Sequence, residues 1–461
     1  MAIFQNNLLA GAGAQSSDST HTIDQSIRFN DNDSPFMSRT QQSGTQTTWT
    51  ISCWVKIGNM PGDFTIWSVH TGYQSFAQIR SSTGLEFAVG NGSSSASLHD
   101  ITRLFRDPSA WYHLVMVFDS TNAISSERAR IYVNGQRETS FSTLGSWAKD
   151  YASNVGSTQT MYIGEQGTGG NHMDGYIAEF VQIDGQALEP SSFGEYNSSG
   201  IWVPKNVSGL TFGTNGCYIK GETASDLGND SSGNNNDFTT SGLVASDQVL
   251  DSPTNNFAVY NILYNVGDVD FPTYSEGNLS VDFNYFGKRS PVSTFALPTD
   301  SDAYCEFYIK TSASSTHNSG VGIGQGDANN AGNVALTNGI TYNFNGYKMI
   351  GGTATPFGNT YTAGDIIGVY FDLSDNEVDF YKNNTLEGSI SLSTLSGDLF
   401  FLVANNATDQ QVIIANFGQD DTFAGNKTSG SAGASDSSGN GKFYYTRISG
   451  AKALCSKSLG S

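Results

Sequence analysis

Acidic and amide side chains gather in one short loop, and their chemistry bears on metal binding. The segment DLGNDSSGNNND, residues 226–237, contains Asp226, Asp230, Asn234 and Asp237 among glycines. Oxygen ligands on a loop suit Ca²⁺, which takes roughly six to eight of them. The spacing is not that of an EF-hand, because the glutamate that closes such a loop is missing. The loop is a candidate Ca²⁺ site, and the competing interpretation is a turn-rich linker of the same composition.

Two carboxylates at alternating positions raise the question of sugar hydrolysis. Glu377 and Asp379 share one face of an expected strand, and retaining glycosidases use two carboxyl groups about 5–5.5 Å apart. Lys382 stands where a third acid would be wanted, so a solvent-facing polar stripe is favoured. No Ser-His-Asp arrangement is readable, and GIGQGDANNAG (residues 322–332) lacks the Lys-Ser/Thr of a phosphate loop. We therefore expect a protein that is not an enzyme.

Aromatic side chains beside polar groups are candidates for sugar binding. Sandwich proteins bind ligands on loops at a rim or on a concave face. The candidates are Trp67, Tyr73 and His172 in the first half of the chain and Tyr342, Phe344, Tyr347 and Tyr361 in the second. The competing interpretation places half or more of them in the core or in a sheet.

Composition and charge exclude some partners. A net charge of −21 with only 22 Lys and Arg leaves few cations for phosphates, so we expect no nucleic-acid partner. The acidity serves either solubility or divalent-cation binding. Four cysteines lie far apart, without metal-site or disulfide spacing, which fits a reducing cytoplasm. No signal peptide and no long apolar run are present, so we expect no membrane insertion.

The elements that would position these residues are short strands. Segments rich in β-branched and aromatic residues recur about every ten residues, the rhythm of an all-β sandwich. We expect two antiparallel β-sandwiches. The expected organisation is an N-terminal docking arm at 1–20, a first sandwich at 21–205, a turn-rich connector with few core residues at 206–256, a second sandwich at 257–418 and a Gly/Ser-rich C-terminal segment at 419–461.

Two hairpins repeat the same pattern, one in each sandwich. ARIYVNGQ (residues 129–136) and VDFYKNNTLEG (residues 378–388) each follow an apolar strand that ends in Phe-Asp. Asn134-Gly135 and Asn383-Asn384 suit a type I′ turn, in which both central residues need a positive φ. We expect both hairpins at the centre of a sheet.

The first 20 residues hold a small apolar cluster before a Gly/Ala/Ser-rich tract. The cluster is Ile3, Phe4, Leu8 and Leu9. A mobile terminus has such a composition. Large apolar residues ahead of a spacer favour an arm that docks on another protein.

Two family resemblances are carried by longer segments. The first block resembles a laminin-G-like (concanavalin A-like lectin) domain through SIRFNDNDSPFMSR, TWTISCWVKIGN, WYHLVMVFDS and MYIGEQGTGGNHMDGYIAEFVQIDGQ. The second block resembles a SPRY domain through YCEFYIK, VGIG and GDIIGVYFDLSDNEVDFYKNNTLEG. The resemblance covers roughly residues 21–420 and implies two jelly-roll sandwiches of related build.

The combination of the two blocks in one chain indicates a class of protein. With FQNNLLAGA, DSSGNNND and KALC, it resembles virion proteins of marine tailed bacteriophages. This resemblance implies a tail-fibre or appendage protein, made in the host cytoplasm, that is a homo-oligomer (a trimer), docks on other virion proteins through its arm and displays its sandwiches to host-surface glycans. The alternatives are a capsid-decorating or fibre protein with a structural role, and a glycan-degrading enzyme on the same scaffold.

Overall fold

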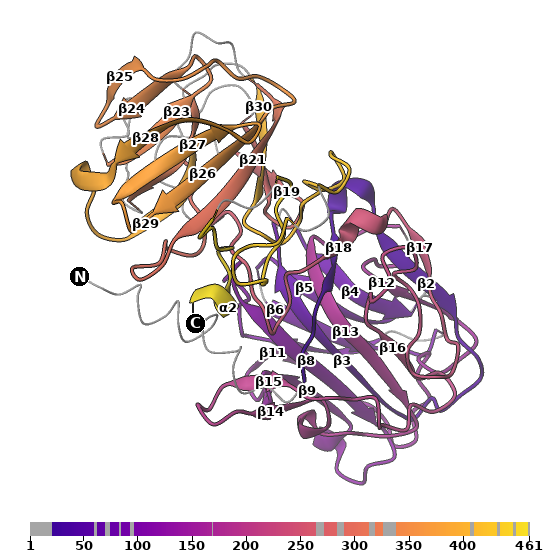
Figure 1. Cartoon of the computed structure of the whole chain (residues 1–461). Coiled ribbons are helices and arrows are strands. Elements are labelled where there is room, and N and C mark those ends of the chain that lie inside the picture. The colour runs from indigo at the N-terminus through magenta and orange to yellow at the C-terminus, as the bar shows by residue number, and fades with distance from the viewer. Residues whose placement is uncertain are drawn as a thin grey trace. The chain divides into compact units, whose positions relative to one another are not determined.

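The structure, a computed structural model, describes residues 21–59, 62–69, 74–82, 84–92, 96–167, 169–263, 272–283, 290–312, 319–325, 338–405, 410–430, 434–445 and 449–459. Within these ranges antiparallel strands dominate, with short 3₁₀ turns and one short α-helix, α2 (Ser456–Leu459), so the expected all-β class is confirmed. Two compact units meet in sequence between Thr254 and Asn255 (Figure 1). No helix in the described ranges is long and apolar enough to cross a membrane.

The first unit is a sandwich of two large sheets. One sheet has the order β10 (Gln136–Arg137), β9 (Ala129–Val133), β8 (Trp111–Asp119), β3 (Thr48–Ile57), β13 (Gly175–Asp184), β1 (Ser26–Phe29) and β18 (Gln248–Val249), and β16 (Cys217–Ile219) also pairs with β13. The other has the order β11 (Phe141–Leu144), β7 (Ser97–Ile101), β6 (Gly84–Val89), β5 (Ser75–Arg80), β4 (Phe64–Val69), β12 (Thr160–Ile163), β2 (Phe36–Thr40) and β17 (Thr239–Ser241). A separate hairpin joins β14 (Gly194–Tyr196) and β15 (Trp202–Pro204).

Strand β3 shows why the first sheet is buried on both sides. Trp49, Ile51, Cys53 and Val55 alternate along it and face the core between the two sheets. Trp54 lies on the opposite face, in a second apolar cluster outside the sandwich. Later parts of the chain cover that face, so the whole strand is buried from its second residue onward.

The expected connector is wrong: residues 206–254 are an integral part of the first unit. They supply β16, β17 and β18, the 3₁₀ turn η5 (Ala245–Asp247) and core side chains such as Phe238. Asp251 pairs with Lys56 over 2.7 Å, and both side chains are fully buried. The segment looked like a linker because its loops are organised by Asn and Asp side chains and contain few apolar residues.

The second unit is a smaller sandwich. Its larger sheet has the order β19 (Thr273–Ser275), β20 (Ser280–Phe283), β30 (Gln411–Asn416), β21 (Ala303–Thr311), β26 (Ile366–Asp372), β27 (Glu377–Lys382) and β28 (Thr385–Ser391). The other has the order β25 (Thr353–Pro356), β24 (Tyr347–Ile350), β23 (Gly339–Asn343), β22 (Gly320–Gln325) and β29 (Leu399–Ala404).

The turns of the two repeated hairpins form as expected, but the expected position at the centre of a sheet is wrong. Each hairpin lies at one edge of its sheet, because β10 and β28 are terminal strands. Asn134 and Gly135 have φ of 48° and 76°, and Asn383 and Asn384 have φ of 48° and 68°. Each first Asn also accepts a hydrogen bond through its side chain, Asn134 from the His113 N–H (2.8 Å) and Asn383 from the Ile366 N–H (2.9 Å). In both units this bond ties the turn to the beginning of the neighbouring strand, β8 or β26, so the repeat belongs to the architecture.

The Gly/Ser-rich C-terminal segment packs on the second sandwich. Phe423, Phe443 and Leu454 are fully buried. The buried carboxylate of Glu306 on β21 accepts hydrogen bonds from the backbone N–H groups of Tyr444 (2.7 Å) and Tyr445 (3.0 Å). The segment is therefore held by the core and by one carboxylate.

Candidate functional site at one rim of the first sandwich

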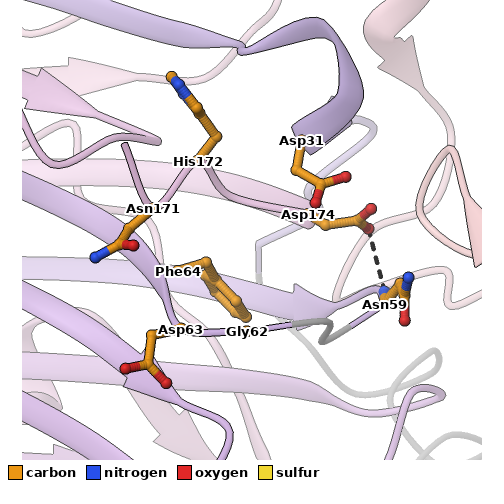
Figure 2. A pocket seen from close by; sticks show the side chains of 8 residues that line it. All are labelled: Asp31, Asn59, Gly62, Asp63, Phe64, Asn171, His172 and Asp174. Carbon is orange, nitrogen blue, oxygen red and sulfur yellow. Dashed lines mark hydrogen bonds between the residues drawn. The ribbon is translucent and has the colours of Figure 1, made fainter. Parts of the chain in front are cut away.

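Several strand ends of the first unit converge at one edge, and the loops there enclose a pocket. Gly175 at the start of β13 lies opposite both Phe29 at the end of β1 and Ile57 at the end of β3. The pocket, here called the rim pocket, has a volume of about 320 Å³ (Figure 2). Its lining residues are Asp31, Asn59, Gly62, Asp63, Phe64, Asn171, His172 and Asp174.

Asp174 is the fixed carboxylate of the rim pocket. Its side chain is buried, and its Oδ1 accepts a hydrogen bond from the Asn59 N–H over 3.2 Å, the dashed line in Figure 2. Its carbonyl oxygen accepts another from the Gly58 N–H, also at 3.2 Å. A Cβ on Gly58 would lie 2.0 Å from Asp174 Oδ1. Glycine at position 58 is therefore required for the carboxylate to sit where it does.

The other two carboxylates of the pocket have different surroundings. Asp63 accepts hydrogen bonds from Arg80 Nε (3.3 Å) and from the Ser81 N–H (3.1 Å), so a cation balances it. Asp31 opens the 3₁₀ turn η2 (Asp31–Asp33), and its side chain is partly exposed. Figure 2 shows Asp31 and Asp174 on one side of the Phe64 ring, with Asp63 and Asn171 on the other. Acceptors thus line two sides of an apolar ring.

Asn171 and His172 come from the loop before β13. Asn171 has φ 51°, a left-handed conformation that Asn tolerates, and its carbonyl accepts from the Thr65 N–H over 2.8 Å. Its exposed amide donates to Gln166 Oε1 at 3.2 Å. His172 Nδ1 lies 3.7 Å from Glu165 Oε2, and burial raises the pKa of that carboxyl. The loop therefore presents both donors and acceptors at the pocket.

This arrangement suits hydroxyl groups better than a metal ion. Carboxylate oxygens accept hydrogen bonds from hydroxyl groups, and the Asn side chain both accepts and donates them. Among the described residues, no group of three or more His, Cys, Asp or Glu side chains lies close enough to hold a metal ion. The pocket can therefore orient a small polyhydroxylated ligand.

The predicted sugar-binding residues do not form one site in the structure. His172 lines the rim pocket, and Tyr347 is 38% exposed on β24 of the second unit. Tyr73 lies outside the described residues. The prediction is wrong for the remaining four, which are buried in the cores of the two sandwiches with at most 3% exposure: Trp67, Tyr342, Phe344 and Tyr361. Their aromatic faces pack on other rings, for example Trp67 on Trp49 at 5.9 Å, so no ligand reaches them.

The predicted calcium residues share one loop, and two of them already accept hydrogen bonds from backbone N–H groups. Asp230 Oδ1 accepts from the N–H groups of Tyr218 and Ser232, and its Oδ2 accepts from Asn236. Asp237 Oδ1 accepts from the Asp230 N–H, and the Asn234 amide donates to two carbonyls. Asp226 is exposed. Calcium binding by this loop stays a prediction, and a calcium titration of the protein against Asp226→Asn is its test.

Structural surroundings account for the two carboxylates weighed for sugar hydrolysis and for the buried His113. Glu377 and Asp379 lie on the face of β27 away from the core, which Val378 and Phe380 occupy. His113 is fully buried between the rings of Trp54 and Trp202, and burial lowers its pKa to about 3.

The expected docking residues Ile3, Phe4, Leu8 and Leu9 lie outside the described residues.

Sequence reasoning missed most of the rim pocket. Besides His172, its polar residues were not singled out: Asp31, Asn59, Asp63, Asn171 and Asp174. Each lies in an Asn/Asp/Gly-containing loop directly after or before an expected strand, which is a readable signal. The order of the strands in each sheet decides which loops lie together at one edge, and local sequence patterns do not reveal that order.

Comparison with known families bears on the first unit. Residues 30–192 match the family model Laminin_G_3, described as the concanavalin A-like lectin/glucanases superfamily. No curated protein matches the sequence. Among solved structures, the SPRY domain of human HERC1 is 15% identical, with 30% of this chain and 87% of that one covered and a TM-score of 0.27. A SAP-like pentraxin from Limulus polyphemus is 18% identical, with coverages of 37% and 80% and a TM-score of 0.28.

Proposed function

We propose that the first sandwich is a carbohydrate-binding module and that the rim pocket holds the sugar without cleaving it. The observation that carries the proposal is the grouping of Asp31, Asp174 and Asn171 around the edge of Phe64 in one pocket. The match of residues 30–192 to a lectin and glucanase superfamily supports the same ligand class.

The chemistry of the pocket favours binding over turnover. Glycoside hydrolysis needs one carboxyl group as acid and a second as nucleophile or base. Here Asp63 is balanced by Arg80, and Asp174 is fixed by the Asn59 N–H. The partly exposed Asp63 and Asp31 can accept hydrogen bonds from the hydroxyl groups of a ligand, and the buried Asp174 shapes the pocket beside them. A sugar would be oriented by these acceptors and by the exposed Asn171 amide.

The experiment is a glycan-binding screen of the full chain. Wild type and Asp31→Ala/Asn171→Ala are compared on an array of bacterial surface polysaccharides. We expect selective binding by wild type and at least a tenfold loss in the double variant, because two hydrogen-bonding side chains are removed at once. Glu222→Gln, which removes an exposed carboxylate elsewhere in the same unit, is the matched control and should bind like wild type. Equal binding by all three proteins would rule out the rim pocket as the sugar-binding site.

For the biological setting, we propose a bacteriophage virion appendage that displays this module to host-surface glycans. The support is the sequence resemblance, including the apolar cluster of the first 20 residues. Weak sites displayed in many copies would act together, since linkage raises their effective concentration. Deleting residues 1–20 should release the protein from particles, and unchanged incorporation would count against a docking arm.

Two alternatives are separated by simple assays. A glycan-degrading enzyme would create new reducing ends when the purified protein is incubated with host polysaccharide, and the proposed module would not. A capsid-decorating protein with a structural role would be incorporated normally but would bind no glycan on the array.

A further inference from the structure

A second pocket lies at the opposite end of the first sandwich. It has a volume of about 380 Å³ and is here called the amide pocket. Its lining residues are Gln46, Asn91, Gly92, Ala152, Ser153, Asn154, Ser157 and Gln159. Gln46 precedes the start of β3, whereas Asn59 of the rim pocket follows its end. A ten-residue strand spans roughly 30 Å, so the two pockets are separate sites.

The floor of the amide pocket is rigid because it is bonded to the core. Ser153 Oγ accepts a hydrogen bond from Trp49 Nε1 (2.9 Å) and donates to the Gln46 carbonyl (2.8 Å). The Asn154 amide donates to the Val69 carbonyl (3.2 Å), and its oxygen accepts from Ser75 Oγ (2.5 Å). Both residues are 2% exposed. The pocket is therefore formed before any ligand arrives, which reduces the entropy cost of binding.

Two side chains of the wall keep their hydrogen-bonding capacity. Among the described residues, the amide groups of Gln46 and Gln159 have no hydrogen-bond partner, although the backbone of both residues is bonded. Each amide offers an acceptor oxygen and two donor hydrogens. Together they can satisfy neighbouring hydroxyl groups, each of which donates one proton and accepts another.

The character of the lining selects the ligand. None of the eight residues carries a titratable side chain, so the lining itself offers no counter-ion for an anion or a cation. None is aromatic, so a flat ring such as a nucleobase has nothing to stack on. Ala152 is the one apolar side chain, so an apolar ligand gains little. A small, neutral, hydroxyl-rich molecule satisfies all three conditions.

We propose that the amide pocket is a second ligand site, specific for an uncharged sugar unit. It differs from the rim pocket in charge, since the rim pocket contains three carboxylates and a histidine. The first sandwich then has two sugar sites at opposite ends, and it can bridge two glycan chains or two distant parts of one chain. Bridging by such a unit strengthens attachment to a dense polysaccharide beyond what either site provides.

The test uses neutral methyl glycosides of glucose, mannose and galactose as probes, followed by saturation-transfer NMR with the full chain. Gln46→Ala/Gln159→Ala should weaken binding of at least one probe tenfold or more, and Asp31→Ala/Asn171→Ala should leave binding at this pocket unchanged. The Gln substitutions break no hydrogen bond within the described residues, so the fold should persist, which an unchanged thermal midpoint would verify. Ala152→Arg, which fills the mouth from an exposed position, should also abolish the binding.

The outcomes separate this site from the rim pocket. Probe affinities that are unchanged for every glycoside in both amide-pocket variants overturn the second site, and so does the absence of probe binding to wild type up to about 100 mM. Loss of all probe binding in Asp31→Ala/Asn171→Ala alone would support the rim pocket and overturn the amide pocket. Loss in the amide-pocket variants alone would support the second site, whatever the rim pocket binds.

Discussion

The backbone N–H of Asn59 donates a hydrogen bond to Oδ1 of Asp174 over 3.2 Å and joins the end of β3 to the start of β13. This bond fixes a buried carboxylate beside the rim pocket. The pocket therefore depends on how closely two adjacent strands approach at one edge of the sheet, and the closeness of that approach depends on Gly58.

The first prediction uses this close approach. Gly58→Ala places a methyl group against Asp174 Oδ1, so the carboxylate must turn and lose its bond to Asn59. We expect a loss of about 2 kcal/mol in unfolding free energy, typical of a hydrogen bond to a charged group, together with weaker glycan binding. Urea titration measures the first effect.

Gly62→Ala is the matched control for that prediction. Gly62 also lines the rim pocket, but a Cβ there meets no heavy atom within 4 Å. Its stability and binding should stay close to those of wild type. Similar losses in both variants would show that Asp174 is not held by the space around Gly58.

The second prediction concerns the fully buried pair Lys56–Asp251, which ties residues 206–254 to the first sandwich. Asp251→Asn leaves the Lys56 ammonium buried without its counter-ion, so unfolding free energy should fall by about 3–5 kcal/mol. All six tryptophans of the chain lie in this unit, so their fluorescence reports its unfolding. Glu222→Gln breaks the exposed pair with Lys220 and should cost roughly 0–1 kcal/mol. Equal costs for the two variants would contradict an integral role for the segment.

The third prediction is an acid sensitivity of the first unit. Burial lowers the pKa of His113 to about 3 and that of His99 to about 4, below the ordinary value of 6.5. Below pH 6.5 these histidines bind protons in the unfolded chain but not in the folded unit. Their contribution to the unfolding free energy is therefore fully present above pH 6.5 and is lost as the pH falls toward 3. For His113 alone the loss at pH 4.5 is on the order of 3 kcal/mol. His113→Gln should flatten the dependence, and a variant slope equal to that of wild type would refute this assignment.

The fourth prediction is the opposite trend in the second unit. Burial raises the pKa of Glu306 to about 7 from 4.5, although the N–H groups of Tyr444 and Tyr445 oppose the shift. Between these two pKa values the Glu306 carboxyl stays protonated in the folded unit but loses its proton in the unfolded chain. Its contribution to the unfolding free energy is therefore fully present below pH 4.5 and is lost as the pH rises to about 7. Glu306→Gln should remove this fall, measured by urea unfolding with NMR signals of the second unit. Persistence of the fall in the variant would assign it to other groups.

The sequence predicts the fold class and the hairpins because these depend on local signals. Alternation along β3 places Trp49 and Cys53 in the core, and Asn-Gly or Asn-Asn selects a turn with two positive φ angles. The connector was misjudged because Phe238 and Asp251 reach the first sandwich through loops whose composition resembles a linker. Burial over such sequence distances is a property of topology, which local patterns do not contain.

The candidate site was less predictable than the fold. An aromatic residue near polar groups is typical both of a sugar platform and of a sandwich core, and Trp67 belongs to the core. His172 was found because it stands beside polar residues in a loop. Asp31 and Asp174 are more than a hundred residues apart and share a pocket only because β1 and β13 are neighbours.

The central claim is that the first sandwich binds a sugar in the rim pocket, and an experimental structure of the protein with the best-bound oligosaccharide from the glycan screen tests it most directly. The account predicts sugar density in the rim pocket, with hydroxyl groups within hydrogen-bonding distance of Asp31 or Asp174 and of Asn171. Sugar density confined to another surface, with the rim pocket unaltered from its free form, would contradict the account.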